Sequence, residues 1–225
     1  MKTPFFTIVR AIIRKDLQAE LRSKELIATM LLFALLSVLI FSFALELDRT
    51  AREEAVSGVL WVTVVFSSIL GLNRSMAMER EGGNMDGMLL APIDRSAVFV
   101  GKLFGNYVFA LAVGLVLLPL MSILYNMNLL RPWLLVTLVI GTFGISTSGT
   151  LLAAMTVQTR SREALLPIVM LPVILPLLLG AVRATTGVAN DAPVNDWMLW
   201  PQVIAVVDVI YLVLCYVTFP YVIEE

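Results

Sequence analysis

The chain has 225 residues, of which 59% are hydrophobic and 15% charged, and its mean hydropathy of +0.91 excludes an ordinary water-soluble domain. It has no histidine and one cysteine, Cys215, which excludes imidazole-ligated metal sites, acid–base catalysis by histidine and disulfides within the chain. The formal net charge of -1 carries little information, because in a membrane protein the position of each charge matters more than the sum.

The first 25 residues predict an amphipathic helix that lies in the membrane surface. Six basic residues are interspersed there with apolar residues at a mostly helical spacing. The apolar run 26–45 follows, and at roughly 20 residues it is long enough to cross the bilayer. A cleaved secretory signal is the alternative, since residues 42–44 resemble a cleavage site, but the run is longer than the apolar part of such a signal. We therefore predict an uncleaved first span.

Five further apolar segments follow, so the chain is expected to be an all-α membrane protein with six transmembrane helices. The interfacial helix covers residues 1–25, and the transmembrane domain covers 26–225. The approximate spans are 26–45, 55–72, 97–125, 133–157, 164–182 and 198–222. At the start of the third span, Ser96 is the expected N-cap, and Lys102 is expected to extend its amine to the membrane interface.

Small residues indicate where the spans pack closely. Gly101 and Gly105 form a GxxxG pair on the third span, which permits close contact with another helix. The fourth span has a cluster of glycine, serine and threonine over residues 141–149, which favours tight packing over a substrate path. Residues 183–197 are expected to form the longest loop on the side opposite the N-terminus, with Trp197 in an interfacial belt.

The fifth span contains three prolines, Pro167, Pro172 and Pro176. Each proline inside a helix removes a backbone hydrogen bond, so this span is expected to be bent or locally broken. The bend can be a packed structural feature or a hinge, and the residues alone do not decide between the two.

Asp208 lies near the middle of the sixth span and is the one acid inside a span. A carboxylate inside a membrane is costly and is by default a candidate functional group. A structural use is favoured here, because no basic residue is evident at a similar depth. Asp208 would then be protonated, or paired with a hydroxyl or amide group of a neighbouring helix or subunit.

The distribution of lysine and arginine predicts the orientation of the six spans. Counting both residue types, twelve lie on the side of the N-terminus and four on the other side. The four are Arg49, Arg52, Arg131 and Arg183. The positive-inside rule therefore places both termini in the cytoplasm.

The longest polar segment, residues 73–102, lies between the second and third spans and is expected on the cytoplasmic side. Glu79, Arg80 and Glu81 come at the end of the second span, and two glycines that follow break the helix. These charges can be a solvated helix end that stays out of the lipid. They can also meet complementary residues of a soluble partner.

A short helix is predicted at residues 84–91. Asn84 suits the N-cap, Asp86 suits the first turn, and Pro92 ends the run. The side chains that form its apolar face are Met85, Met88 and Leu89. A helix of about two turns is too short to be stable alone, so it is expected to dock on a partner surface.

The sequence has no motif for catalysis or nucleotide binding. It lacks GxxxxGK[ST], a paired-carboxylate, Ser/His or Cys/His arrangement, and a basic patch suited to nucleic acid. We therefore expect no catalytic residues, no metal site, no nucleic-acid partner and no directly bound cofactor. Any energy must come from another subunit.

The run EREGGNMDGMLLAPIDRSAVFVGK resembles the cytoplasmic signature of ABC-2 type permeases, in which an acidic–basic pair, a glycine and a short helix ending in proline precede a Gly-Lys pair. The proline-spaced fifth span, ALLPIVMLPVILPLLLGA, adds to this likeness. With six spans and no large external domain, the chain is similar over nearly its whole length to the CcmB family, the permease-like subunit of the haem exporter in cytochrome c maturation.

This resemblance implies a subunit of an ABC complex in the bacterial inner membrane, with ATP bound by a CcmA-like cytoplasmic ATPase. CcmC-like and CcmD-like membrane subunits would lie alongside, a CcmE-like chaperone would leave with haem, and partner subunits would carry the haem. A homodimer is left open. The residues expected to dock the ATPase are Glu79, Arg80, Glu81, Gly83, Met85, Asp86, Met88, Leu89 and Pro92.

Two alternatives stay open from the sequence. The first is an ABC-2 type exporter of another substrate, such as a lipid, a polysaccharide or a drug. The second is a membrane scaffold that holds the ATPase and the haem-handling subunit together without transporting anything.

Overall fold

The computed structural model describes residues 4–45, 49–81, 93–156 and 162–224, and these ranges contain helices and no strand. The helices are α1 (Phe5–Ser23), α2 (Glu25–Ala44), α3 (Arg49–Glu81), α5 (Arg95–Leu124), α6 (Pro132–Thr156), α7 (Arg162–Ala189), α8 (Val194–Trp197) and α9 (Leu199–Glu224). Six of them are long and apolar enough to cross a membrane: α2, α3, α5, α6, α7 and α9. The prediction of an all-α protein with six such helices is confirmed.

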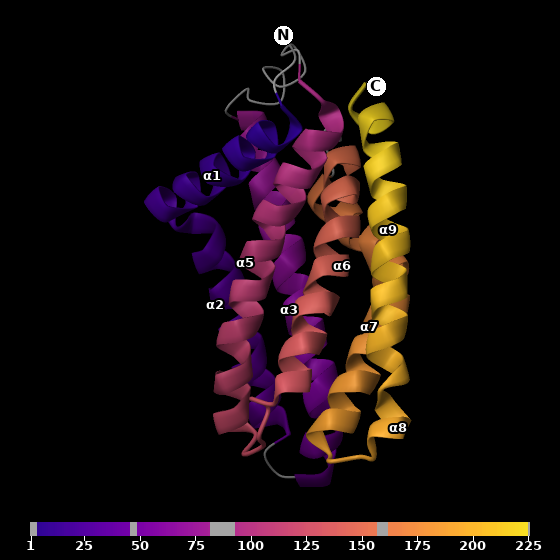
Figure 1. Ribbon diagram of the computed structural model, residues 1–225. Helices are drawn as coiled ribbons and strands as arrows, with labels where there is room; N and C mark the ends of the chain where they lie inside the picture. The colour runs from indigo at the N-terminus through magenta and orange to yellow at the C-terminus, as the bar shows by residue number, and fades with distance from the viewer. Residues whose placement is uncertain (1–3, 46–48, 82–92, 157–161, 225) are drawn as a thin grey trace.

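The six long helices run side by side, and α1 is inclined to them at one end of the bundle (Figure 1). The start of α1, the end of α3, the start of α5 and the end of α9 all lie at this end, which we call the α3–α5 end. The connections from α5 to α6 and from α7 to α8 lie at the opposite end. The outer faces of α2, α7 and α9 expose large apolar side chains, as a bundle surrounded by lipid requires.

Helix α6 packs against α3, α5, α7 and α9, and its small residues permit this close contact. Three of its glycines face large or polar side chains of neighbouring helices: Gly141 faces Trp61, Gly144 faces Leu177 and Asp208, and Gly149 faces Leu72 and Met170. Several hydroxyl groups of α6 donate to carbonyls one turn earlier, which satisfies them inside an apolar bundle: those of Thr137, Thr142, Thr147 and Ser148. The predicted tight packing of this span is confirmed.

The predicted loop over residues 183–197 is wrong. Helix α7 continues to Ala189, and only residues 190–193 connect it to α8. The extra turns are held by the bundle, because the indole Nε1 of Trp61 in α3 donates to the Thr185 hydroxyl at 2.9 Å. A polar, glycine-containing segment is therefore helical here through tertiary contacts that its local sequence does not reveal.

Trp197 does not belong to an exposed interfacial belt, contrary to expectation. Its side chain is buried, and its Nε1 donates to the carbonyl of Ala192 at 3.2 Å. The ring packs edge-on against Trp133, with 5.5 Å between the ring centroids, and Gly187 leaves room for it on α7. The indole therefore closes the α7–α8 connection instead of facing the lipid headgroups.

An ion pair ties this connection to the start of α6. The guanidinium of Arg131 donates to Asp191 Oδ2 at 2.8 Å and to the carbonyl of Val188 at 2.7 Å. Hydrogen bonding from Arg131 lowers the pKa of the Asp191 carboxyl below its ordinary value. At pH values above the ordinary carboxyl pKa, the pair therefore contributes its full stabilisation. This stabilisation is lost as the pH falls through the lowered pKa of Asp191. Its contribution is small, because both groups are solvent-accessible.

The predicted N-cap of the third span is wrong, and of the bend or local break expected in the fifth span the structure excludes the local break. Helix α5 begins at Arg95 with Asp94 as the N-cap, because the Asp94 carboxylate accepts the backbone N–H of Ser96 at 2.9 Å. Helix α7 runs without a local break through its three prolines. The hydroxyl of Tyr211 in α9 donates to the carbonyl of Val173, in the turn before Pro176, at 2.5 Å. A side chain of a neighbouring helix thus supports the backbone where prolines weaken the helical hydrogen bonding.

Candidate functional site

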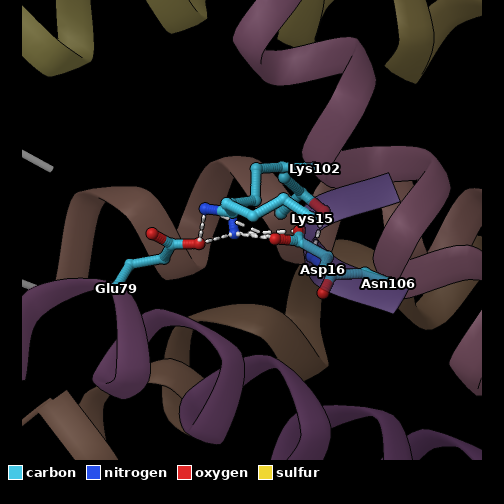
Figure 2. A network of polar contacts seen from close by, with 6 residues as sticks. Lys15, Asp16, Glu79, Lys102 and Asn106 are labelled. Carbon is cyan, nitrogen blue, oxygen red and sulfur yellow. Dashed lines mark hydrogen bonds and ion pairs between the residues drawn. The ribbon is translucent and has the colours of Figure 1, made fainter. Parts of the chain in front are cut away.

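Charged side chains from three helices meet at the α3–α5 end of the bundle (Figure 2). They are Lys15 and Asp16 of α1, Glu79 in the last turn of α3, and Lys102 near the start of α5, and we call them the charge cluster. The Lys102 amine donates to the two Asp16 carboxylate oxygens at 3.1 and 2.9 Å and also pairs with Glu79 Oε1. The Lys15 amine donates to the same Glu79 oxygen at 2.5 Å.

Burial makes this charge cluster more than a surface ion pair. The side chain of Lys102 is 4% exposed and that of Glu79 is 6% exposed, whereas Lys15 is 40% exposed. A charge that has left water is tolerated only when it is paired and hydrogen-bonded. Two cations and two carboxylates meet this condition together, and removal of any one member leaves a buried charge without full compensation.

At the charge cluster the structure contradicts the expectation for Lys102 and one of the two alternatives left open for Glu79. Lys102 does not extend to the membrane interface, because α1 covers it and brings Asp16 within hydrogen-bonding distance. Glu79 is not part of a solvated helix end, since its side chain turns inward. Sequence reasoning also missed Lys15 and Asp16. The sequence does contain a signal for these two residues. Lys15 and Asp16 follow Ile12 at helical spacing, so both charges lie on the apolar side of the N-terminal helix.

The GxxxG pair of α5 receives α1. A Cβ atom built at Gly101 would lie 2.8 Å from the Cβ of Ile12, and one built at Gly105 would lie 3.3 Å from Asp16 Oδ2. Close helix contact at this pair was predicted, and it is confirmed with α1 as the partner helix. Without side chains at these two positions, the α1 backbone comes near enough for Asp16 to reach the Lys102 amine.

A second acid of α1, Glu20, fixes the angle between α1 and α2. Its side chain is buried and its carboxylate accepts the backbone N–H groups of Leu26 at 3.3 Å and Ile27 at 2.9 Å. These donors belong to the first turn of α2, where helical N–H groups lack partners and the helix dipole favours negative charge. The turn between the helices is completed by Lys24 in a left-handed conformation, with φ of 57°. Helix α1 is thereby held at both its middle and its end.

A cavity of about 150 Å³ lies beside the charge cluster, between α1, α3 and α5. Its polar lining comes from the charge cluster, Glu20 and Ser75. The second carboxylate oxygen of Glu79 is buried and accepts no hydrogen bond from the residues that the structure describes. The cavity is polar and large enough for water to hydrate this oxygen.

The charge cluster lies at the base of the segment that was expected to dock a partner. Glu79 precedes residues 82–92 and Lys102 follows them, so their ion pair joins the helix that enters this segment to the helix that leaves it. A displacement applied to residues 82–92 would therefore act on α3, α5 and α1 together. This arrangement suits the transmission of motion between the three helices.

Most of the predicted docking residues lie outside the described residues. This holds for the helix at 84–91 and for Gly83, Met85, Asp86, Met88, Leu89 and Pro92, which stay predictions. Of the remaining members, Arg80 is exposed and Glu79 belongs to the charge cluster. Glu81 is the last residue of α3, and its side chain is not described.

Asp208 and the three prolines of α7 are not part of the charge cluster. The Asp208 side chain is buried between α9, α6 and α7, where it faces Gly144 and Leu177. Its Oδ1 has no hydrogen-bond partner among the described residues. The phenol of Tyr107 in α5 is near enough to interact with it electrostatically. Cys215, also in α9, is a buried free thiol.

Comparison with known proteins gives consistent matches over most of the chain. The family model described as CcmB protein matches residues 7–224. Heme exporter protein B of Rhodobacter capsulatus is 31% identical over 195 residues, which cover 82% of this chain and 87% of the relative. The protein of the same name from Paracoccus denitrificans is 28% identical over 192 residues, covering 83% and 87%. That of Escherichia coli K12 is 27% identical over 191 residues, covering 83% and 86%.

Proposed function

The chain belongs to the CcmB protein family, and from this premise we propose that this multi-pass membrane protein is the transmembrane subunit of a haem exporter complex. In this proposal a separate CcmA-like ATPase hydrolyses ATP in the cytoplasm. The chain converts that cycle into helix motion, which serves haem handling and the release of a haem-loaded, CcmE-like chaperone during cytochrome c maturation. CcmC-like and CcmD-like subunits complete the complex and carry the haem, since the chain itself has no histidine to bind it.

The observation that carries this proposal is the buried ion pair between Glu79 and Lys102. It braces the two ends of residues 82–92, which are the residues proposed to dock the ATPase. Helix α3 has 33 residues and is therefore about 50 Å long, at 1.5 Å per residue. A rigid brace at one end of such a helix can pass a displacement along the bundle, whereas an unbraced loop would absorb it.

The distribution of basic residues along the bundle sets the proposed orientation in the membrane. We place the α3–α5 end in the cytoplasm of a bacterium, at the inner membrane, because the basic residues are concentrated there. Helix α1 then lies at the cytoplasmic membrane surface, with one face on α5 and the remainder available to lipid.

The docking proposal is tested by Met85→Asp and Leu89→Asp. Each puts a charge on the proposed apolar docking face, and burial of an unpaired charge is strongly unfavourable. We expect the amount of ATPase that co-purifies with the chain to fall at least about tenfold, while membrane insertion stays normal. Asn190→Asp, an added charge at the opposite end, is the matched control and should leave co-purification unchanged.

Normal co-purification with either variant would contradict the docking proposal. Cytochrome c maturation is measured in the same cells. If the chain could be deleted without loss of mature cytochrome c, an exporter of another substrate would become the better description.

We further propose that the prolines of α7 act as a hinge. Replacement of Pro172 and Pro176 together by alanine restores two backbone N–H donors and stiffens the helix. We expect cytochrome c maturation to fall severalfold, while the complex still assembles at normal yield. Pro119→Ala, at another proline inside a long helix, is the control and should have little effect. Unchanged maturation in the double variant would exclude the hinge and favour a scaffold without moving parts.

A further inference from the structure

Helix α1 carries a row of arginines that takes no part in the charge cluster. Arg10, Arg14 and Arg22 are exposed, and their spacing of four or eight residues places them in one line along the helix. Together with Gln18 they line a shallow groove on the outer side of α1. Within the described residues none of the three arginines has an ion pair or a side-chain hydrogen bond, so no acid among those residues neutralises them. We call these three residues the arginine row.

Large apolar side chains lie directly beside the arginine row. Phe6 is 83% exposed and lies one turn from Arg10, and Leu21 is 75% exposed and lies two turns from Arg14. Exposed side chains of this size are unfavourable in water but suit the boundary between lipid headgroups and acyl chains. A row of cations with an apolar edge therefore matches the surface of a membrane better than the acidic surface of a soluble protein.

The opposite face of α1 is already occupied, which fixes the direction of the arginine row. Ile8 and Ile12 are buried against α5, and Asp16 is bonded to Lys102. The arginine row must therefore point away from the bundle, at the end where α2 begins its span. Guanidinium groups form paired hydrogen bonds with phosphate oxygens, so a lipid phosphate with net negative charge is the ligand that this chemistry favours.

We propose that the arginine row binds the headgroups of anionic phospholipids in the leaflet next to the α3–α5 end, and that this contact holds α1 over Lys102. The inference rests on the proposed interfacial placement of α1. Anionic lipid would thereby stabilise the same helix that completes the charge cluster.

The test is a lipid titration of the full chain in detergent micelles, with bound lipid counted by native mass spectrometry. Dioleoyl phosphatidylglycerol is the anionic probe, and dioleoyl phosphatidylcholine is the zwitterionic one. Each arginine near an anionic surface contributes on the order of tenfold or less to binding, so the row contributes about 10²-fold. We expect the variant with Arg10→Gln, Arg14→Gln and Arg22→Gln to lose this preference for phosphatidylglycerol.

Three controls make the outcome specific. Lysine at the same three positions keeps the charge and should keep most of the preference. Arg183→Gln, a single exposed arginine at the opposite end, should have no effect. Millimolar inorganic phosphate should not displace the lipid, because the apolar edge contributes to binding.

Equal binding of both lipids by the unaltered chain, or unchanged preference in the triple glutamine variant, would overturn the proposal. Loss of ATPase co-purification without loss of lipid preference would also overturn it and would identify the arginine row as a protein contact. The melting temperature in phosphatidylcholine micelles should be the same for all variants, since the row contacts no acid in the part of the chain that the structure describes. Failure of ATPase docking in Met85→Asp would leave the lipid measurement unaffected, so the two proposals fail separately.

Discussion

Replacement of Lys102 by methionine is expected to detach α1 from the bundle. Methionine fills a similar volume but removes the most buried cation of the charge cluster. The carboxylates of Asp16 and Glu79 then share Lys15 alone, which is partly exposed. Breaking a buried ion pair by removal of one partner typically costs about 3–5 kcal/mol. Because marginal stability is of similar size, the folded fraction should fall sharply.

Two measurements check this result in the purified chain. Thermal unfolding in detergent should show a strong fall in melting temperature, and limited proteolysis should cut between α1 and α2, because Glu20 of the detached α1 no longer caps the start of α2. Lys102→Met combined with Asp16→Asn and Glu79→Gln removes the uncompensated charges and should recover much of the lost stability. A single variant that melts like the unaltered chain would show that the ion pairs do not hold α1.

The function of the charge cluster can be separated from its stability in the triple variant. If the triple variant folds and keeps α1 in place, the proposed docking of the ATPase on residues 82–92 should be unaffected. Cytochrome c maturation should nevertheless fall, because methionine at position 102 donates no hydrogen bond, so α3 and α5 lose the ion pair that braces them. Full maturation by a stable triple variant would mean that the three substituted charges serve folding alone.

The six spans could be predicted from sequence because the lipid environment restricts the backbone of a spanning segment to few conformations. Each span must satisfy its own hydrogen bonds, so length and hydropathy are sufficient to locate it. The close packing of α6 could likewise be predicted from the residues of this span alone, because many small residues in one membrane span indicate close contact with neighbouring helices.

The charge cluster could not be predicted, because it depends on which helix faces which. Lys102 and Glu79 are 23 residues apart, and Lys102 and Asp16 are 86 residues apart. A lysine near the start of a helix is normally expected to reach water. Here the packing of α1 against Gly101 covers the Lys102 side chain and separates it from water. The helical extension of α7 escaped prediction for the same reason, since Thr185 is held by an indole from α3.

The second large effect is expected at Gly144, where α6 meets α9. A Cβ atom built there would lie 2.0 Å from Asp208 Oδ1 and 2.7 Å from Leu177 Cδ1. Gly144→Ala must therefore displace a buried carboxylate or separate the two helices, and overpacking of this kind typically costs about 1–3 kcal/mol. Gly58→Ala is the matched control. No atom lies within 4 Å of its added methyl group, and alanine favours the helix by up to about 1 kcal/mol.

The same clash offers a way to learn what Asp208 does. Asp208→Ala makes room for the new methyl group, so the combination of Gly144→Ala and Asp208→Ala should melt higher than Gly144→Ala alone. No recovery in the double variant would place the clash at Leu177 instead. If the recovered protein assembles with its ATPase but fails to mature cytochrome c, the Asp208 carboxyl serves the transport cycle. If maturation returns with the fold, the acid serves packing between α6 and α9.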